Sequence, residues 1–290
     1  MFPDFIGIGA QKAGTTWLDR NLRAHPQVWM PKRKELHYFD RGITDTGASN
    51  DEWYASIFEP GGGHVTGEIT PAYSMLDQSR VAHVYRIMPH AKIIFFMRNP
   101  IERAWSQAVM HFSRAKGQKI ESVAEKRVRK HFARKGSRLR TDYLRILDRW
   151  REFFSEGQIF VGFLEDIHFY PKDLLRRLYS FLGVDPSFES PGVGQTIHSR
   201  SAGKMSTQLG AYLASVYRDD LRRLHQRFGG YASFWLYCAE RLTDDPPSEE
   251  YIPYPLWSSK LWEEWAGAPE TVLRSSRLQS GPLSHVRAAR

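Results

Sequence analysis

The stretch that most constrains the fold lies near the start of the chain and reads Phe-Ile-Gly-Ile-Gly-Ala-Gln-Lys-Ala-Gly-Thr-Thr-Trp-Leu over residues 5–18. An apolar run of strand length meets Gly9 and Gly14, and apolar residues at helical spacing follow. This order predicts a strand, an anion-binding loop and a helix, because glycines let N–H groups turn inward and the first helical turn adds further donors. The side chains that contribute to this anion-binding site would be those of Lys12, Thr15 and Thr16.

The loop departs from the phosphate loop of nucleoside triphosphatases. The GxxxxG spacing is present, but Thr15 stands where that motif has its lysine, and a lysine occurs inside the loop instead, at Lys12. The glycine spacing alone also fits an ordinary strand-to-helix turn. The order Gln-Lys-Ala-Gly-Thr-Thr-Trp-Leu resembles the sulfotransferases that use 3′-phosphoadenosine 5′-phosphosulfate. The resemblance implies that the 5′-phosphosulfate is held by Lys12, Ala13, Gly14, Thr15 and Thr16, with Trp17 near the adenine.

A second motif follows the uninterrupted apolar run 93–97, which fits a strand buried on both faces of a parallel sheet. Arg98 comes at the carboxyl end of that strand, where ligands gather in open α/β sheets, so we expect it beside the loop. Asn99 and Pro100 predict the cap and first turn of a helix. An arginine that merely pairs with a nearby carboxylate is the alternative. The sequence resembles the family's 3′-phosphate motif, which implies that Arg98 and Ser106 bind that phosphate.

A third segment, 32–39, places one carboxylate among cations and aromatic residues: Lys-Arg-Lys-Glu-Leu-His-Tyr-Phe. Composition alone favours a solvated charged loop with an aromatic anchor. The segment resembles the Glu-x-His-Phe-Phe sequence of sulfotransferases that act on heparan sulfate, in which the glutamate is the catalytic base. We therefore expect Glu35 to be the base and Lys12 to stabilise the transferred group. His37 is the second candidate for the base; alternatively, it orients the acceptor or takes the role of a second active-site lysine that this chain lacks.

Residues 65–73 predict a short strand that ends at Pro71, and they resemble the Glu-Lys-Thr-Pro-Ala-Tyr segment of the heparan-type enzymes. Those enzymes carry a second active-site lysine where this chain has Ile69. Either another cation, Lys34 or Arg33, takes the role of this second lysine, or the sulfuryl group is stabilised chiefly by Lys12.

The rest of the chain predicts further elements. Residues 121–140 are strongly basic with a thin apolar stripe, which predicts a surface helix that either gathers an anionic acceptor or is simply solvated. Further helices are expected at 141–154, 172–182 and 205–228, and a strand at 158–163. The Gly- and Ser-rich region 192–204 matches in position the family's basic loop over the nucleotide. That resemblance implies that Arg200 and Lys204 bind the nucleotide.

Length and composition bound the architecture. With 290 residues, 41% of them hydrophobic, the chain can bury one large core, and we expect an α/β fold: a single P-loop-like domain with a central parallel sheet flanked by helices. The expected domain is 1–242, and residues 243–290 form a C-terminal extension that packs on it or is partly flexible. The tryptophans at 257, 262 and 265 either cover an acceptor pocket or pack against the domain, the latter being favoured.

Charge and cysteine content narrow the setting. A net charge of +9 favours polyanionic ligands, and the single cysteine, Cys238, excludes an intramolecular disulfide and a Cys-based metal site. No apolar run reaches the ~18 residues of a membrane span, and the start lacks a secretory pattern. We expect a cytoplasmic protein with no metal, no nucleic-acid partner and no membrane insertion. The oligomeric state is not indicated.

The sequence leaves two classes of function open, an enzyme of one of two kinds or a non-catalytic binding protein. The first is an enzyme that moves a sulfuryl group from 3′-phosphoadenosine 5′-phosphosulfate to a hydroxyl or amine of a small-molecule, glycoside or carbohydrate acceptor by in-line displacement. A nucleotide kinase or triphosphatase with an aberrant loop is the second enzyme, disfavoured by the displaced lysine. A non-catalytic polyanion-binding protein would explain the charge but not the two phosphate motifs.

Overall fold

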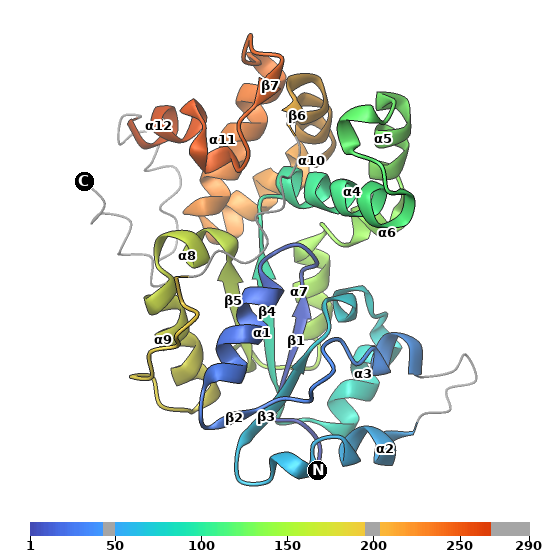
Figure 1. Ribbon diagram of the computed structural model, residues 1–290, viewed down its shortest axis with the longest axis vertical. Coiled ribbons are helices and arrows are strands. Elements are labelled where there is room, and N and C mark those ends of the chain that lie inside the picture. The colour runs from blue at the N-terminus through green and yellow to red at the C-terminus, as the bar shows by residue number, and fades with distance from the viewer. Residues whose placement is uncertain (43–49, 195–203, 268–290) are drawn as a thin grey trace. The chain divides into compact units, whose positions relative to one another are not determined.

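Five segments form one parallel sheet in the order β2-β3-β1-β4-β5 (Figure 1). The computed structural model describes residues 1–42, 50–194 and 204–267 of the chain. The strands are β1 (Phe5–Gly9), β2 (Val28–Trp29), β3 (Val65–Ile69), β4 (Lys92–Met97) and β5 (Ile159–Phe163). The central strand β1 pairs with β3 and β4, so Ile6 lies beside both Glu68 and Ile93. The predicted α/β fold with a central parallel sheet flanked by helices is confirmed.

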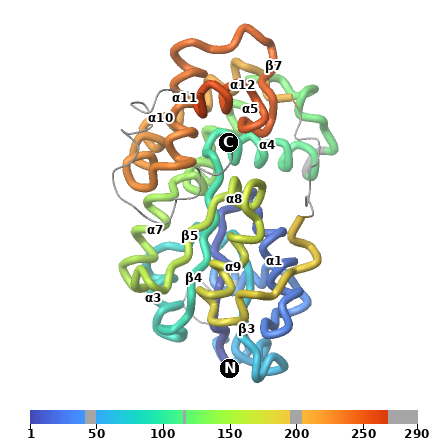
Figure 2. The backbone as a smooth tube through the Cα atoms, turned by 90° about the vertical axis from the view of Figure 1, so that its left-hand side faces the viewer, coloured from blue at the N-terminus to red at the C-terminus, as the bar shows by residue number. Residues whose placement is uncertain are grey.

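Helices cover both faces of this sheet. Figure 2 shows α3 and α7 on one side and α1 on the other. Helix α9 packs on the α1 side, where the Tyr179 hydroxyl donates to the carbonyl of Asn21. These helices are α1 (Thr15–Ala24), α2 (Asp51–Ser56), α3 (Gln78–Ile87), α7 (Tyr143–Arg151), α8 (Leu164–Phe169) and α9 (Pro171–Leu182).

The chain divides into two compact units. The first comprises Met1–Arg98 and Leu139–Arg200, and it contains the whole parallel sheet. The second comprises Asn99–Arg138 and Ser201–Arg290. The predicted boundary after residue 242 falls inside a helix of the second unit, and the division into 1–242 and 243–290 stays a prediction.

The second unit is mainly helical. Its helices are α4 (Pro100–Lys116), α5 (Glu125–Phe132), α6 (Lys135–Leu139), α10 (Thr207–Phe228), α11 (Tyr231–Asp244) and α12 (Lys260–Gly267). Strands β6 (Met205–Ser206) and β7 (Tyr251–Ile252) pair antiparallel. Asn99 caps α4 as expected, because its side chain accepts from the N–H of Ile101.

The single surface helix predicted for residues 121–140 is wrong in one respect: the segment forms two helices, α5 and α6, after a short turn. The break follows from packing within the second unit. Arg103 is fully buried in α4 and donates to the carbonyl of Ser137 in α6, while the Ser137 hydroxyl donates to Gln107. These buried contacts hold α6 against α4 and fix where the basic segment turns.

The described part of the C-terminal extension packs within the second unit. Trp262 and Trp265 lie against Phe234 of α11, with ring centroids 4.8 and 5.5 Å apart, which confirms the favoured packing role for these two residues. The buried carboxylate of Glu102 accepts from the N–H of Leu256. Among the described residues, no helix is both long enough and apolar enough to cross a membrane.

Candidate active site

The loop between β1 and α1 has the backbone that its glycines predict. Gly9 and Gly14 have φ values of 141° and 89°, and Gly14 directly precedes α1. Since glycine has no side chain, nothing at this position caps the first N–H groups of the helix, which face outward with the positive end of the helix dipole. The N–H of Ala10 donates to the carbonyl of Phe96, so the loop is tied to β4.

Arg98 lies beside this loop, as its place at the end of β4 predicts. Its Nη1 donates to the carbonyl of Lys12 at 3.2 Å, and the Tyr143 hydroxyl donates to the carbonyl of Arg98 at 2.8 Å. The arginine side chain is thereby held at the carboxyl edge of the sheet, next to the start of α1. The predicted proximity of Arg98 and the loop is confirmed.

The other residues predicted to bind nucleotide lie in different parts of the chain. Trp17 is buried in α1, and its indole N–H donates to the carbonyl of Val193 at 3.2 Å. Ser106 belongs to α4 of the second unit. Lys204 also belongs to the second unit, where its ammonium lies 5.7 Å from the ring centroid of Tyr251. Arg200 lies outside the described residues, so the nucleotide-binding roles of these four residues stay predictions.

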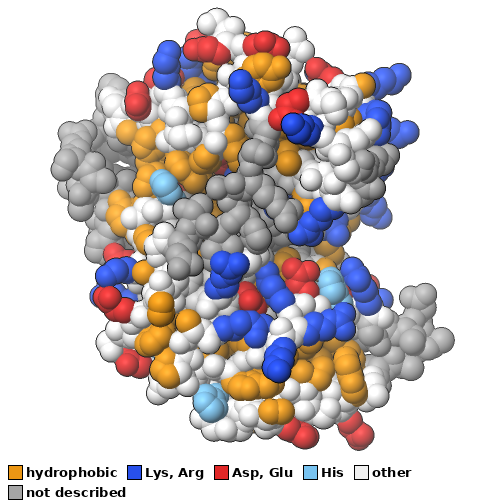
Figure 3. All heavy atoms as spheres, viewed as in Figure 1, with side chains coloured by type: hydrophobic (Ala, Val, Ile, Leu, Met, Phe, Trp, Pro, Cys, Tyr) orange, Lys and Arg blue, Asp and Glu red, His pale blue; other side chains and the backbone are white. Residues whose placement is uncertain are grey.

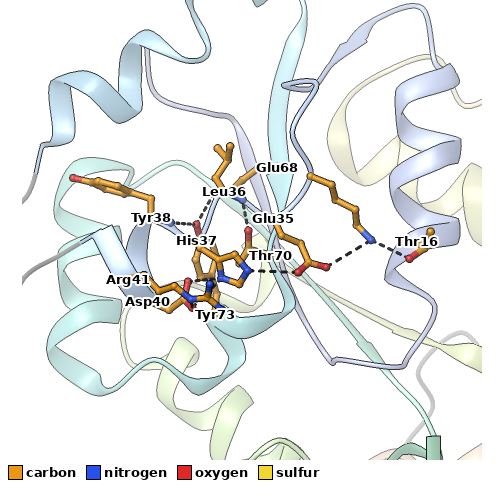
Figure 4. Close-up of polar contacts among 11 residues, drawn as sticks. Thr16, Glu35, Leu36, His37, Tyr38, Asp40, Arg41, Glu68, Thr70 and Tyr73 are labelled. Atoms are coloured by element: carbon orange, nitrogen blue, oxygen red, sulfur yellow. Dashed lines mark hydrogen bonds and ion pairs between the residues drawn. The ribbon is translucent and has the colours of Figure 1, made fainter. Parts of the chain in front are cut away.

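A continuous series of polar contacts leads from α1 to the candidate base (Figure 4). The Lys34 ammonium donates to the Thr16 hydroxyl at 3.0 Å and lies 3.9 Å from the Glu35 carboxylate. The other Glu35 oxygen is 3.6 Å from His37 Nε2, and His37 Nδ1 is 3.0 Å from the Asp40 carboxylate. Three of the predicted site residues, Thr16, Glu35 and His37, are thus brought together, with Lys34 between two of them.

Exposure differs along this series. The Glu35 side chain is 41% exposed and that of His37 17% exposed, so the glutamate is the more open to an incoming acceptor. Burial lowers the pKa of Lys34, while Asp19 and Glu35 act in the opposite direction. Lys34 is therefore a half-buried cation with carboxylate neighbours.

The three residues predicted to act in catalysis share an unusual backbone conformation. Lys12, Glu35 and His37 have φ values of 74°, 61° and 59°, and within residues 1–42, 50–194 and 204–267 they are the non-glycine residues with positive φ. Each such residue costs of order 1–3 kcal/mol and persists where surrounding contacts enforce it, often at functional sites. The strained positions coincide with the residues that the motifs selected.

A fully buried carboxylate, Glu68 of β3, lies below the strained segment. It accepts hydrogen bonds from the hydroxyls of Tyr54 at 2.9 Å, Tyr73 at 2.7 Å and Thr70 at 2.6 Å, and from the N–H of Leu36 at 3.3 Å. Burial raises the pKa of Glu68, although these four hydrogen bonds oppose that shift. The same surroundings raise the pKa values of Tyr54 and Tyr73 well above the ordinary value.

Ile69, at the position of the second lysine in the resembling segment, is a core residue. It is 1% exposed, and a Cβ added to Gly7 of the neighbouring strand would lie 2.7 Å from Ile69 Cγ1. The isoleucine therefore fills the space above a glycine inside the sheet. Of the two cations considered as a replacement, Lys34 contacts the candidate base, whereas Arg33 is exposed.

Comparison with known proteins decides the family. Residues 43–189, about half of the chain, match the model of a family described as "Sulfotransferase family". The chain belongs to the sulfotransferase family. This result favours the sulfotransferase prediction over the triphosphatase and polyanion-binding alternatives.

Individual relatives agree with this assignment. The membrane-associated sulfotransferase kil1 of Dictyostelium discoideum is 37% identical over 38% of this chain and 23% of its own length. The heparan sulfate glucosamine 3-O-sulfotransferase 6 of mouse is 28% identical over 63% of this chain and 53% of its own. A crystal structure of a sulfotransferase from Alicyclobacillus acidocaldarius superposes with a TM-score of 0.61 at 25% identity, covering 78% of this chain and 96% of that one. The chain thus matches 23% of the length of the first of these sequence relatives and 53% of the length of the second.

One member of this contact series, Asp40, was not predicted from the sequence. Its signal was available, since a carboxylate three residues after His37 reaches the same side of a helical turn. The turn itself, Tyr38–Gly42, was not predicted. Figure 3 shows Lys and Arg side chains gathered over α1 on one face of the first unit. The exposed cations of this unit include Arg20 of α1, Lys32 and Arg33. Such a surface favours the approach of anionic ligands.

Proposed function

We propose that this sulfotransferase-family chain transfers a sulfuryl group from 3′-phosphoadenosine 5′-phosphosulfate to a hydroxyl or amine of an acceptor by in-line displacement. The observation that carries the proposal is the contact series Thr16–Lys34–Glu35–His37, which joins the start of α1 to a candidate base. In transfer of this kind, positioning of the reactants and stabilisation of charge provide most of the rate enhancement, so the protein need not form a covalent bond to the substrate.

The loop fits the donor. The uncapped start of α1 at Gly14 suits an anion, Lys12 adds a cation, and Arg98 offers a guanidinium at the same edge of the sheet. When bound, the donor supplies an activated sulfuryl group on a phosphate leaving group. Lys12 and Lys34 would then stabilise the negative charge that develops on the oxygens around sulfur, and Thr16 would orient the Lys34 ammonium. Lys34 thereby takes the role that Ile69 cannot fill.

Glu35 is the proposed base. It would accept the proton of the acceptor hydroxyl while the new O–S bond forms and the bond between sulfur and the phosphate oxygen breaks, leaving 3′-phosphoadenosine 5′-phosphate. Asp40 beside Nδ1 favours the His37 tautomer that carries its proton there. Nε2 then faces the Glu35 carboxylate, where it can hold the proton that Glu35 receives. His37 would therefore assist Glu35 or, if Glu35 only orients the acceptor, replace it.

A carbohydrate hydroxyl is the first acceptor class to test. The mouse relative is named for sulfation of glucosamine at an oxygen, and the exposed cations on the face of the first unit suit an acceptor that already carries negative charge. Small hydroxylated molecules and glycosides form the second class.

The test is a transfer assay. The protein is incubated with 3′-phosphoadenosine 5′-phosphosulfate and a panel of carbohydrates, glycosides and small alcohols, and products are read by mass spectrometry as the gain of one SO₃ group. Calorimetry in parallel should show that 3′-phosphoadenosine 5′-phosphate binds much more tightly than ATP, which lacks a 3′-phosphate. Tighter binding of ATP than of 3′-phosphoadenosine 5′-phosphate, or no mass gain in any acceptor of the panel, would count against the proposal.

A further inference from the structure

We infer that Glu68 and Tyr73 form a clamp that holds Glu35 and His37 in their active backbone conformation, and that both are positioning residues for sulfuryl transfer. This inference rests on the proposed function, since it assigns the conformation a catalytic role. It starts from the two N–H groups on either side of His37, those of Leu36 and Tyr38. Each of them donates to a member of this pair.

The contacts form a closed arrangement around one residue. The N–H of Leu36 donates to Glu68 Oε2 at 3.3 Å, and the N–H of Tyr38 donates to the Tyr73 hydroxyl at 3.0 Å. That hydroxyl in turn donates to Glu68 Oε1 at 2.7 Å. The backbone is therefore fixed immediately before and after His37, by groups that converge on a single carboxylate (Figure 4).

The clamp explains why strained residues stay where they are. Glu35 and His37 both have positive φ, a conformation that side chains other than glycine adopt only when surrounding contacts impose it. Leu36, between them, is buried and bonded to Glu68, so both strained residues adjoin an anchored position. Glu68 is itself fixed because it is fully buried in β3, paired in register with Ile6 of β1. The rigid sheet thus sets the direction in which the Glu35 and His37 side chains leave the backbone.

The chain offers a matched control. Tyr54, in α2, donates its hydroxyl to the same oxygen, Glu68 Oε1, at 2.9 Å. Both Tyr54 and Tyr73 are fully buried, so replacing either by phenylalanine removes one buried hydroxyl from the same carboxylate. Only the Tyr73 hydroxyl is the acceptor that receives the N–H of Tyr38. Comparing Tyr73→Phe with Tyr54→Phe therefore separates the clamp from the stability of the buried cluster.

The experiment measures three quantities on the whole chain for wild type and both variants. They are turnover at saturating donor and acceptor, the unfolding free energy in urea, and amide hydrogen exchange at Tyr38. Tyr73→Phe should lower turnover by about tenfold to a hundredfold, the range expected when a reacting group is misplaced by a fraction of an ångström to an ångström. It should also speed exchange at Tyr38 and leave affinity for 3′-phosphoadenosine 5′-phosphate unchanged. Tyr54→Phe should lose similar stability but keep most of its turnover and the Tyr38 protection.

The outcomes separate the inference from the proposed function. Equal turnover losses in the two variants, or unchanged Tyr38 exchange in Tyr73→Phe, would overturn the clamp. A wild-type protein that transfers sulfate to no acceptor would overturn the proposed function and, with it, the catalytic role of the clamp. In that case the exchange data would still show whether Tyr73 holds the backbone. A second pair of variants replaces Glu68 itself. In Glu68→Gln the amide oxygen can still accept a hydrogen bond from the N–H of Leu36, whereas in Glu68→Leu the side chain can accept neither from Leu36 nor from the Tyr73 hydroxyl. Glu68→Gln should therefore retain more turnover than Glu68→Leu.

Discussion

The role of Lys34 can be tested by removing its charge while keeping its bulk. Lys34→Met retains an unbranched apolar stem and deletes the ammonium that donates to Thr16 and lies 3.9 Å from Glu35. Two unit charges about 4 Å apart interact by roughly 4 kcal/mol at an effective dielectric constant of 20. With side chains 25% and 41% exposed, solvent screens part of that interaction. Loss of one preorganised charge at a reaction centre typically costs about 10²–10³ in turnover, and we expect a loss in that range.

The neighbouring cation Arg33 supplies the control. It precedes Lys34 but is exposed, so Arg33→Met removes the same formal charge from a solvated position. Exposed charges contribute at most about 1 kcal/mol, which limits the expected loss to about fivefold. Initial rates at saturating donor and acceptor, measured at two salt concentrations, distinguish the two. Comparable losses of turnover in Lys34→Met and Arg33→Met would refute a specific role of Lys34. They would indicate only a general effect of the protein's positive charge on the anionic donor.

The pH dependence gives an independent check on Lys34. Because burial lowers its pKa from 10.5, the ammonium should lose its proton at a lower pH than an exposed lysine does. Turnover of the wild type should therefore fall on the alkaline side before pH 10.5, as the protonated form is depleted. In Lys34→Met this alkaline limb should be absent from the remaining activity. A limb that persists unchanged in the variant belongs to another group.

Four further substitutions test the other site residues. Lys12→Ala should reduce turnover by about two orders of magnitude or more in the same rate assay, and a normal rate would end its assignment to the donor site. Arg98→Ala should weaken binding of 3′-phosphoadenosine 5′-phosphate far more than that of adenosine 5′-phosphosulfate by calorimetry; equal losses would refute contact with the 3′-phosphate. Glu35→Gln should keep nucleotide affinity and lose about two to four orders of magnitude in turnover, while His37→Ala should cost less; the reverse ranking would make His37 the base.

The sequence predicted most of the first unit because its signals are local. The apolar runs that form β1 and β4 and the glycines flanking the loop each specify their own backbone. Parallel pairing of adjacent strands then brings Arg98 to the loop, so even this long-range contact followed from topology. Helix α11, in contrast, was not identified, although the end of the preceding helix at residue 228 was predicted correctly.

The contacts of the site itself were harder to predict. Lys34, Arg33 and Lys12 were equivalent candidates on composition, and only the fold shows which of the first two reaches Glu35. The positive φ value of Glu35 carries no propensity signal, and that of His37 carries only a weak one, since histidine is enriched at positive φ but neither position is a glycine or an asparagine. They depend on Glu68 and Tyr73, more than thirty residues away in sequence.

The packing of Ile69 supports the proposal that a cation from a different segment takes the role of the second lysine. Its side chain packs over Gly7, where the space is so tight that an added Cβ on the glycine would lie 2.7 Å away. A lysine at this position would have to extend out of the sheet core or bury its charge, and an uncompensated buried cation is strongly unfavourable. Lys34 avoids that cost because it lies on a half-exposed segment and finds both a hydroxyl and a carboxylate. The proposed cation is therefore next to Glu35 in the chain, so the backbone that positions the proposed base positions Lys34 as well.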